Sequence, residues 1–337
     1  MNVDLAYFEI PFLVPYRVGN ESLTVRRGVM VRICKGKRIG YGEVAPLPGL
    51  HRETLDQALA SLQESIINNT APMWPSAAFG LSCAIETAAA NPRYGFADQA
   101  SSSDIGVNAF FAGGSREAKT AFTDGRFQGF KTIKIKIGRG KSVDDLRTIN
   151  TVLDLVDSDV RIRLDGNRMM SLATAERLLS RVDANRIEYV EEPLQDHADL
   201  SELSRRVGMV MAIDESLHLN VPIEEVLGAP GVEVQVVKPS LIGALEEVES
   251  VVTQGRINGM DTVLSTAIDT SYTIALVARM AGVLGVGDRD HGLSTANLFA
   301  SDVVAPASII DGRMKVALTL PTPNLQFVPS ATFTLPK

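Results

Sequence analysis

The sequence contains few cysteines and histidines, which narrows the chemistry available to it. Two thiols among 337 residues, Cys34 and Cys83, are too few for a disulfide framework or a cysteine-based zinc site, and they favour a reducing compartment. No pair of histidines has the HExxH spacing, and the GxSxG, GxGxxG and Walker-type glycine motifs are absent. Chemistry must therefore come mainly from carboxylates and amines.

The chain also lacks an excess of basic charge and a long apolar run. Its formal net charge is -7, whereas a nucleic-acid surface normally carries a basic stripe. The stretch TIALVARMAGVLGVG is interrupted by Arg279 and is too short to span a bilayer. The start, MNVDLAYFEI, has no basic segment before an apolar core, so we expect no secretion signal. We therefore expect a cytoplasmic globular protein without nucleic-acid or membrane partners.

Residues 1–104 show the pattern of an α+β unit. Extended stretches, SLTVRRGVMVRICKG and RIGYGEVAPL, precede two helical patterns, RETLDQALASLQESIINN and SAAFGLSCAIETAAAN. The segments 16–22 and 46–53 are rich in turn-forming residues and are predicted to be loops. The tail from about residue 300 contains a short strand pattern, ATFTLP. We predict that residues 300–337 return to this unit, which forms a capping domain.

From residue 105 to residue 299 short apolar strands alternate with helical segments. The strands are IGVNAFF, KTIKIKIG, VRIRLDGN, IEYVEEP, VMAIDES, VEVQVVKPS and DTVLST. This alternation is typical of a parallel sheet with crossover helices. We predict an α/β fold, a modified (β/α)7–8 TIM-type barrel with the α+β cap at its N-terminus. An open doubly wound sheet is the alternative, but its glycine fingerprint is absent.

Five consecutive predicted strands end in charged residues, separated by 23 to 29 positions: Lys136, Asp165, Glu191, Asp214 and Lys238. In a (β/α) barrel the carboxyl ends of the strands form the mouth where active sites lie. Side chains alternate along a strand, so these five would face inward while apolar neighbours face the helices. A solvated strand face or an ordinary loop acid would explain any one of them alone, but not the series.

The segment KTIKIKIG follows the same rule. Its isoleucines alternate with Lys134 and Lys136, so the lysine face is predicted to line the barrel interior. Glu192 and Glu215 follow two of the acids directly, and strand alternation predicts that they point away as structural residues. His51 is predicted to be solvent-facing, His291 to lie at the end of the last strand, and Cys83 and Trp74 to pack in the core.

Three inward carboxylates on adjacent strands would repel one another without a cation between them. Oxygen ligands with open positions suit Mg²⁺. A lysine near other cations and partly desolvated has a lowered pKa and acts as a base. A carboxylate substrate on the metal would gain stabilisation of the enediolate formed when its α-proton leaves. The pattern therefore predicts proton abstraction α to the carboxylate of a small molecule.

The ordered set KIKIG, RLDGN, VEEPL, AIDES and VVKPS resembles the muconate-lactonizing branch of the enolase superfamily. The resemblance covers nearly the whole chain, including the GYGEVAPLPG turn of a capping domain. Within the branch, KPSLIGALEE and the pairing of APLPGLHRETL with AFGLSCAIE resemble the o-succinylbenzoate synthases. Gly166, where many relatives carry alanine, and Asp269, where relatives often carry glutamate, depart from the pattern.

The resemblance implies a role for each matching residue. Lys136 is the base, Lys238 stabilises the enediolate, and Lys134 supports Lys136 and the substrate carboxylate. The cofactor is Mg²⁺, with Mn²⁺ as a substitute. The implied metal ligands are Asp165, Glu191 and Asp214. Asn167 orients the ligands, the segments 16–22 and 46–53 close over the substrate, and Ser265 and Thr266 contact its succinyl end.

Two other functions compete with a synthase that dehydrates a succinyl-hydroxycyclohexadiene carboxylate on the way to menaquinone. One is an isomerase on the same site, either an N-succinylamino acid racemase or a dipeptide epimerase, because lysines are present on both sides. The other is a non-catalytic carboxylate-binding protein, which the complete set of charged residues disfavours.

Overall fold

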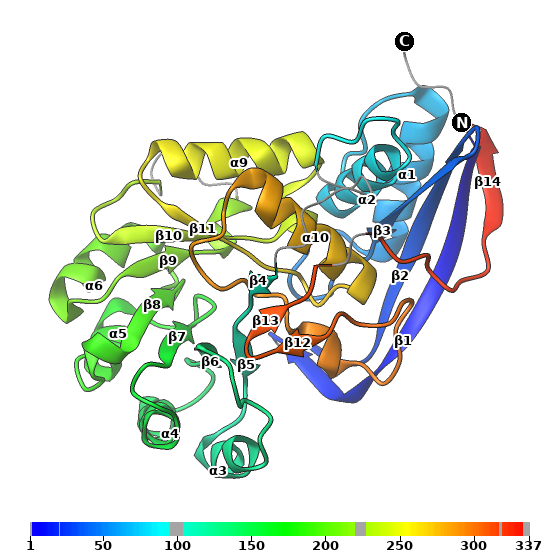
Figure 1. Ribbon diagram of the computed structural model, residues 1–337. Coiled ribbons are helices and arrows are strands. Elements are labelled where there is room, and N and C mark those ends of the chain that lie inside the picture. Colours follow the sequence, from blue (N-terminus) through cyan, green and yellow to red (C-terminus); the bar gives the residue numbers. More distant parts are fainter. Residues whose placement is uncertain (1, 20, 95–103, 220–226, 317–318, 333–337) are drawn as a thin grey trace.

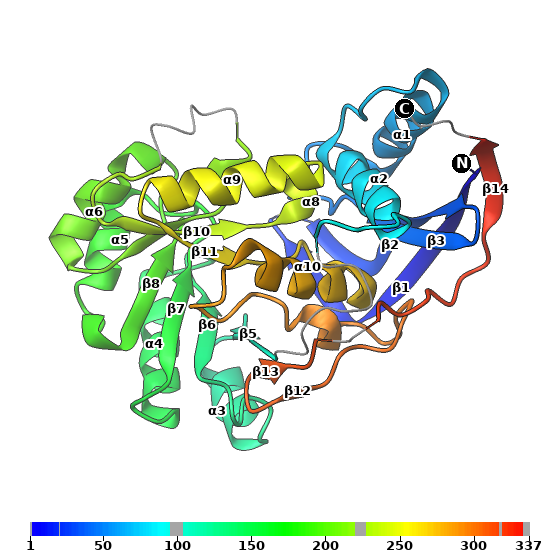
Figure 2. The same ribbon diagram turned by 45° about the horizontal axis from the view of Figure 1, so that its top comes forward.

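The computed structural model describes residues 2–19, 21–94, 104–219, 227–316 and 319–332 (Figure 1). An antiparallel sheet with two helices lies beside a strongly curved parallel sheet that is surrounded by helices (Figures 1 and 2). The described residues include no helix that is both long enough and apolar enough to cross a membrane. The predicted α/β class with an N-terminal cap is confirmed.

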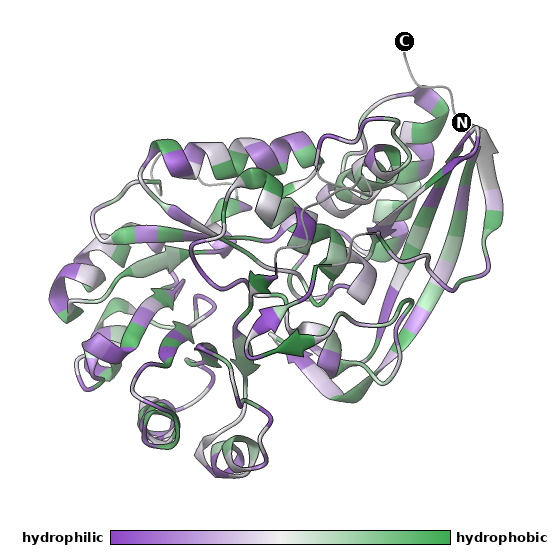
Figure 3. Cartoon of the chain, viewed as in Figure 1, coloured by the Kyte–Doolittle hydropathy of each residue, from purple (hydrophilic) through white to green (hydrophobic). Residues whose placement is uncertain are grey.

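The cap is a four-stranded sheet in the order β14-β1-β2-β3. Its elements are β1 (Asn2–Val18), β2 (Glu21–Lys35), β3 (Arg38–Val44), α1 (Leu55–Asn68), α2 (Pro75–Thr87) and β14 (Val328–Thr332). Bands of hydrophobic and hydrophilic residues alternate along β1 and β2 (Figure 3), as expected for strands with one face on a core. Both predicted helices are present. Thr54 and Gln57 form a capping box at the start of α1, and α2 begins at a proline.

The segment 16–22 is not the loop that the sequence predicts. Tyr16, Arg17 and Val18 pair with residues 21–23, so the hairpin of β1 and β2 continues almost to its tip. Gly19 adopts a positive φ of 54°, and this lets the chain reverse over very few residues. The turn-forming residues therefore indicate a tight turn between two paired strands rather than a loop. The segment 46–53 is a loop, as predicted.

The parallel sheet has the order β11-β10-β9-β8-β7-β6-β5. Its strands and the helices and turns around it are β5 (Ala109–Phe111), α3 (Ser115–Thr123), β6 (Thr132–Lys136), α4 (Ser142–Leu155), β7 (Arg161–Asp165), α5 (Leu172–Leu179), η1 (Ala184–Arg186), β8 (Ile187–Glu191), η2 (His197–Asp199), α6 (Leu200–Val207), β9 (Met211–Ile213), η3 (Glu215–Leu217), β10 (Val232–Val237), α8 (Pro239–Ile242), α9 (Leu245–Ile257), β11 (Asp261–Leu264), α10 (Ser271–Leu284) and η4 (Thr295–Leu298). The helices lie on the outer side of the curved sheet (Figure 2).

Residues 291–292 close the gap between the two edges of this sheet. Ser265 bridges to Gly292 and Val107 bridges to His291, both in parallel orientation. The backbone N–H of His291 also donates to the Gly106 carbonyl at 2.8 Å. The eighth position of the ring is therefore filled by isolated bridges, which is a modified form of the TIM barrel. His291 lies at the end of the last strand position, as predicted.

The C-terminal tail contacts both parts of the molecule. β14 pairs antiparallel with β1 at the edge of the cap sheet. Before it, β12 (Ile309–Ile310) and β13 (Arg313–Met314) form a small hairpin, and β13 pairs with β4 (Ile105–Gly106) at the start of the barrel. The tail therefore joins the cap to the barrel.

One apolar core extends from the cap into the barrel. It contains Phe8 and Met30 of the cap sheet, Phe79 and Cys83 of α2, and the outward side chains of the barrel strands. Cys83 is fully buried in this core, as predicted, and Trp74 is half-buried at the start of α2. The cap therefore packs directly on the barrel, and its residues 16–19 lie beside the carboxyl ends of the strands.

Candidate active site

A cavity of about 690 Å³ lies where the barrel strands end beneath the cap. The hairpin tip contributes residues 16–19, and the loop 46–53 contributes Leu47, Gly49 and Leu50. Predicted site residues also line it: Lys134, Lys136, Asp165, Asn167, Lys238, Ser265 and Thr266. Both segments predicted to cover the substrate therefore face the cavity.

Three lysines that line the cavity form ion pairs with three carboxylates, of which Asp165 also lines it. Lys134 Nζ lies 2.9 Å from Asp165 Oδ2 and 2.5 Å from Glu191 Oε1. Lys136 Nζ lies 2.9 Å from the same Asp165 oxygen, and Lys238 forms an ion pair with Asp214. Register explains the convergence, because Lys136, Asp165 and Glu191 are direct neighbours across β6, β7 and β8.

Burial and opposite charges shift the pKa values of this cluster in different directions. Burial raises the pKa of Glu191 to about 7, although Lys134 opposes the shift. Burial likewise raises the pKa of Asp214. Burial alone would raise the pKa of Asp165, but the ammonium groups of Lys134 and Lys136 hold it far below its usual range. Asp165 is therefore the carboxylate that the lysines hold in its charged form.

Against the effect of burial, neighbouring carboxylates raise the pKa values of two lysines in this cluster. Burial alone would lower the pKa of Lys134, but the carboxylates of Asp165 and Glu191 raise it well above its usual value. Asp214 likewise raises the pKa of Lys238 against the effect of burial. The nearest charges of both lysines are carboxylates, which favour the ammonium form. The lowered pKa of a lysine beside a bound cation stays a prediction.

Asn167 links Lys136 to a further carboxylate. Its Nδ2 donates to Glu215 Oε1 at 2.9 Å, so its Oδ1 is the end that accepts a hydrogen bond from Lys136 Nζ. Glu215 lines the cavity, so the prediction that it points away is wrong. Strand alternation fails there because β9 ends at Ile213 and the turn η3 begins at Glu215.

Glu192 has the structural role that the sequence predicts. Its carboxylate accepts hydrogen bonds from the backbone N–H groups of Asp214 and Ser216, at 2.8 and 3.2 Å, and from the Ser216 hydroxyl at 2.6 Å. Glu192 is fully buried and has a positive φ of 36°. The strained residue after β8 therefore fixes the turn that holds Asp214 and brings Glu215 to the cavity.

Ser265 and Thr266 follow β11 and are both buried in the cavity wall. The Ser265 hydroxyl donates to the Gly292 carbonyl at 3.2 Å, and the Thr266 hydroxyl lies 3.4 Å from that of Thr295. These hydrogen bonds hold both hydroxyls against residues 292–295. Each hydroxyl can therefore bind a ligand only through the donor or acceptor sites that these hydrogen bonds leave free.

The prediction that His51 faces the solvent is wrong, because both of its ring nitrogens are engaged in hydrogen bonds. Its Nδ1 accepts from the Leu47 N–H at 2.9 Å, and its Nε2 lies 3.2 Å from the Ser240 carbonyl oxygen. Since Nδ1 accepts a hydrogen bond, Nε2 carries the proton that is donated to Ser240. The neutral imidazole thus ties the loop 46–53 to α8 at the barrel mouth. Burial and the charge of Arg26 lower its pKa to about 3.

This His51 contact predicts a loss of stability at acidic pH. The unfolded chain binds a proton at a pKa of 6.5 and the folded chain at about 3, so the stabilisation is complete above pH 6.5 and declines as the pH falls toward 3. The slope from this residue is at most ~1.4 kcal/mol per pH unit. Chemical unfolding at a series of pH values measures it. His51→Asn, which keeps a donor and an acceptor but does not titrate, is expected to flatten the curve. Identical slopes would contradict the assignment.

Several cavity residues were missed by the sequence predictions. Asn108 and Phe110 face inward from the first barrel strand, and Lys136 Nζ lies 6.0 Å from the centre of the Phe110 ring. Alternation in IGVNAFF was a usable signal, because Val107, Ala109 and Phe111 are buried on the other face. Arg139 also lines the cavity. It lies beyond the end of β6, where no periodic signal reaches.

The oxygen atoms of the cluster fit a hard divalent cation. Among the described residues, no three His, Cys, Asp or Glu side chains converge as a metal site in their present positions. However, three buried carboxylate oxygens have no hydrogen-bond partner: Glu191 Oε2, Asp214 Oδ1 and Glu215 Oε2. Unpaired buried acceptors are costly, and an all-oxygen donor set suits Mg²⁺. Asp165, Glu191 and Asp214 would hold it.

Models of two protein families match this chain. The family described as enolase C-terminal domain-like matches residues 116–321, and the family described as MenC, N-terminal domain, matches residues 2–88. Curated relatives named o-succinylbenzoate synthase are similar over most of their length. The protein of Citrobacter koseri is 32% identical, covering 88% of this chain and 91% of its own. That of Yersinia pseudotuberculosis serotype O:3 is 31% identical, covering 89% and 91%.

Solved structures share the fold at lower sequence identity. A mandelate racemase/muconate lactonizing protein from Herpetosiphon aurantiacus has a TM-score of 0.83 at 18% identity, covering 96% of this chain and 98% of its own. A substrate-liganded L-Ala-D/L-Glu epimerase from Bacillus subtilis has a TM-score of 0.82 at 18% identity, covering 96% and 99%. The o-succinylbenzoate synthase from Thermosynechococcus elongatus, complexed with Mg in its active site, has a TM-score of 0.73 at 21% identity, covering 90% and 95%.

Proposed function

Since this chain belongs to the enolase superfamily and, within it, to the family of the o-succinylbenzoate synthases, we propose that it is a Mg²⁺-dependent o-succinylbenzoate synthase. The reaction is the dehydration of 2-succinyl-6-hydroxy-2,4-cyclohexadiene-1-carboxylate to o-succinylbenzoate, a lyase step of menaquinone biosynthesis in the cytoplasm. One observation supports it above all others. Two lysines, Lys136 and Lys238, line one cavity, and carboxylates follow or end the three strands between them and pair with the lysines of this cavity.

Lys136 is the base in this proposal. As the neutral amine, its Nζ takes the proton from the carbon α to the substrate carboxylate, and the C–H electron pair becomes negative charge on that carboxylate. Asn167 Oδ1 accepts a hydrogen bond from this nitrogen and holds it over the cavity. Asp165, 2.9 Å away, stabilises the ammonium that forms.

Lys238 stabilises the developing negative charge from the other side of the carboxylate cluster. Its ammonium group is held by Asp214, so it stays charged without reorganisation during the reaction. Mg²⁺ bound by Asp165, Glu191 and Asp214 would supply further positive charge to the substrate carboxylate. Lys134 lies between Asp165 and Glu191 and adds a fixed positive charge near the same carboxylate.

Loss of the hydroxyl group completes the reaction. The electron pair from the substrate carboxylate forms the new C=C bond, the C–O bond breaks, and the hydroxyl leaves as water with the proton that Lys136 received. Lys136 returns to the neutral form. Because the ring loses only water, its overall oxidation state does not change, and no oxidant or second substrate is needed to form the aromatic product. We assign the contacts to the succinyl end to Ser265 and Thr266 in the cavity wall.

An isomerase on the same site is the second candidate, and one observation favours it. Lys136 and Lys238 both line the cavity, so a proton removed by one lysine can be replaced by the other on the opposite face. An N-succinylamino acid racemase or a dipeptide epimerase needs only these two residues and the same cation.

An absorbance assay separates these functions. The purified protein with Mg²⁺ is expected to remove the ultraviolet diene band of the cyclohexadiene acid, while a chelated sample does not. N-Succinylamino acids and dipeptides are followed in parallel by loss of optical rotation and by exchange of the α-proton in ²H₂O. Turnover of these alone would replace the synthase by the isomerase. No turnover of any substrate, with Mg²⁺ bound, would favour a non-catalytic carboxylate-binding protein.

A further inference from the structure

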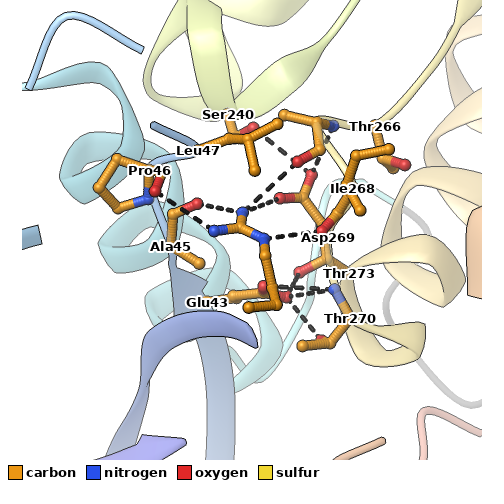
Figure 4. A network of polar contacts seen from close by, with 12 residues as sticks. Glu43, Ala45, Pro46, Leu47, Ser240, Thr266, Ile268, Asp269, Thr270 and Thr273 are labelled. Atoms are coloured by element: carbon orange, nitrogen blue, oxygen red, sulfur yellow. Dashed lines mark hydrogen bonds and ion pairs between the residues drawn. The ribbon is translucent and has the colours of Figure 1, made fainter. Parts of the chain in front are cut away.

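Arg26 of β2 contacts both the cap and the barrel. Its partners Ala45, Pro46, Ile268 and Asp269 lie close together at the junction of the two parts (Figure 4). Arg26 is 1% exposed. Its Nε donates to the Ile268 carbonyl at 2.8 Å, its Nη1 to the Pro46 carbonyl at 3.2 Å, and its Nη2 to the Ala45 carbonyl. The same Nη2 lies 3.3 Å from Asp269 Oδ1. One guanidinium thus holds two segments that are more than 200 positions apart in the sequence.

Each of these segments continues directly into the cavity wall. Residues 45–46 lead into the loop that places Leu47 and Leu50 on the cavity. Residues 267–269 follow Thr266, and Thr266, Ala267 and Ile268 all line the cavity. The residues that accept hydrogen bonds from Arg26 therefore directly adjoin two segments of the cavity wall, the loop 46–53 and residues 266–268.

The second segment depends on external support. Ile268 has a positive φ of 57°, which is strained for a β-branched residue. Asp269 Oδ2 accepts from the Ala267 N–H at 3.0 Å, while its Oδ1 faces Arg26. Arg26 thus supports both the carbonyl of the strained residue and the carboxylate that closes the turn.

A second cap residue holds the end of the same segment. Glu43 of β3 accepts hydrogen bonds from the Thr270 N–H at 3.2 Å, and from the hydroxyls of Thr270 and Thr273, each at 2.6 Å (Figure 4). These groups form the start of α10. Glu43 thus fixes the distal end of residues 266–270. Of these two cap residues, Arg26 is the one whose side chain also bonds to the loop 46–53, at the Pro46 carbonyl.

The geometry of the contacts requires a guanidinium. Three donor nitrogens in one plane reach carbonyls from several directions, which a lysine ammonium on a flexible stem does not reproduce. None of the Arg26 hydrogen bonds among the described residues involves the lysines or carboxylates of the cavity floor. Arg26 therefore acts on the wall rather than on the reacting groups.

We propose that Arg26 is a positioning residue for substrate binding: paired with Asp269, it joins the loop 46–53 to residues 266–269 and so sets the cavity wall that holds the non-reacting part of the substrate. The identity of that part, a succinyl group, rests on the proposed function. The joining of the two segments does not.

Kinetics with two variants test the effect on binding. Arg26→Lys and Asp269→Asn are expected to raise KM for the cyclohexadiene acid by on the order of 10-fold or more while changing kcat by less than about 3-fold, since they affect ground-state and transition-state binding alike. Arg32→Met is the matched control. Arg32 lies on the same strand, and pairs with Asp4 at 2.7 Å, away from the cavity. It is expected to keep the wild-type KM. A fall in kcat with KM unchanged would overturn the proposal.

Amide hydrogen exchange tests the joining of the segments without any substrate. Exchange is expected to rise together in residues 46–53 and 266–270 of both variants, with no change in the peptides of β6 and β8. Asp269→Asn keeps the side-chain acceptor for Ala267 and is the variant chosen in case Arg26→Lys does not fold. A rise in only one segment, or the same rise in Arg32→Met, would overturn the proposal. Absence of wild-type turnover would instead reject the proposed function and leave the exchange result decisive.

Discussion

Lys136→Ala is expected to lower turnover by ~10³-fold or more, because it removes the general base of the proposed reaction. The other amines of the cavity floor are engaged elsewhere. Lys134 lies between Asp165 and Glu191, and Lys238 pairs with Asp214. The fold is expected to persist, since Lys134 Nζ remains 2.9 Å from Asp165 Oδ2. The measurement is kcat with the diene substrate at saturating Mg²⁺, together with the melting temperature.

The chain supplies a matched control for this substitution. Lys131 precedes the same strand, but its side chain is 64% exposed and pairs with Asp159 on the outside of the barrel. Lys131→Ala is expected to keep wild-type turnover. If Lys136→Ala kept turnover within about tenfold of the wild type, which is less than a general base supplies, Lys136 would not be the base.

Chelation of divalent cations is expected to reduce turnover to background, and added Mg²⁺ to restore it. Binding to the folded state alone also stabilises it, by about 2.7 kcal/mol when free Mg²⁺ is 100 times the dissociation constant. The melting temperature should therefore rise with Mg²⁺ concentration in the absence of substrate. This thermal shift reports on the carboxylates independently of catalysis.

Glu191→Gln is expected to abolish the shift caused by Mg²⁺. It replaces a charged ligand by a neutral one of nearly the same size, and turns one of the two acceptor oxygens into a donor. Glu233→Gln is the control, because Glu233 is exposed on β10 and its charge faces away from the cavity. A Mg²⁺-dependent rise that survives Glu191→Gln, or that is lost in Glu233→Gln, would place the cation elsewhere on the molecule.

Strand alternation was sufficient to predict the inward face of the barrel. Lys134, Lys136, Asp165 and Glu191 meet within hydrogen-bond distance because parallel register brings the same end of each strand to one layer. The helix patterns were equally reliable, since apolar residues at helical spacing must face a core. The class of the fold and the charged floor of the cavity therefore followed from local rules.

The remaining errors arise where a local rule stops applying. Glu215 lies past the last residue of β9, so alternation no longer states its direction. His51 is an ordinary loop histidine by sequence, and only the fold brings the Ser240 carbonyl to its ring. Arg26 could not be assigned either, because its partners are mostly backbone carbonyls, which every residue possesses.

The position of β14 has a consequence for how the chain is made. β14 covers the free edge of β1, and residues 291–292 close the barrel ring. Neither the cap sheet nor the ring can therefore be completed before the C-terminal part of the chain has been made. During synthesis on the ribosome, β1 and β2 emerge long before residues 328–332. Until β14 pairs with it, the edge of β1 offers unpaired backbone groups to another nascent chain. Aggregation during expression should therefore depend on this edge. A proline at a β1 position whose backbone N–H points toward the β14 side would remove a donor from this edge and suppress aggregation.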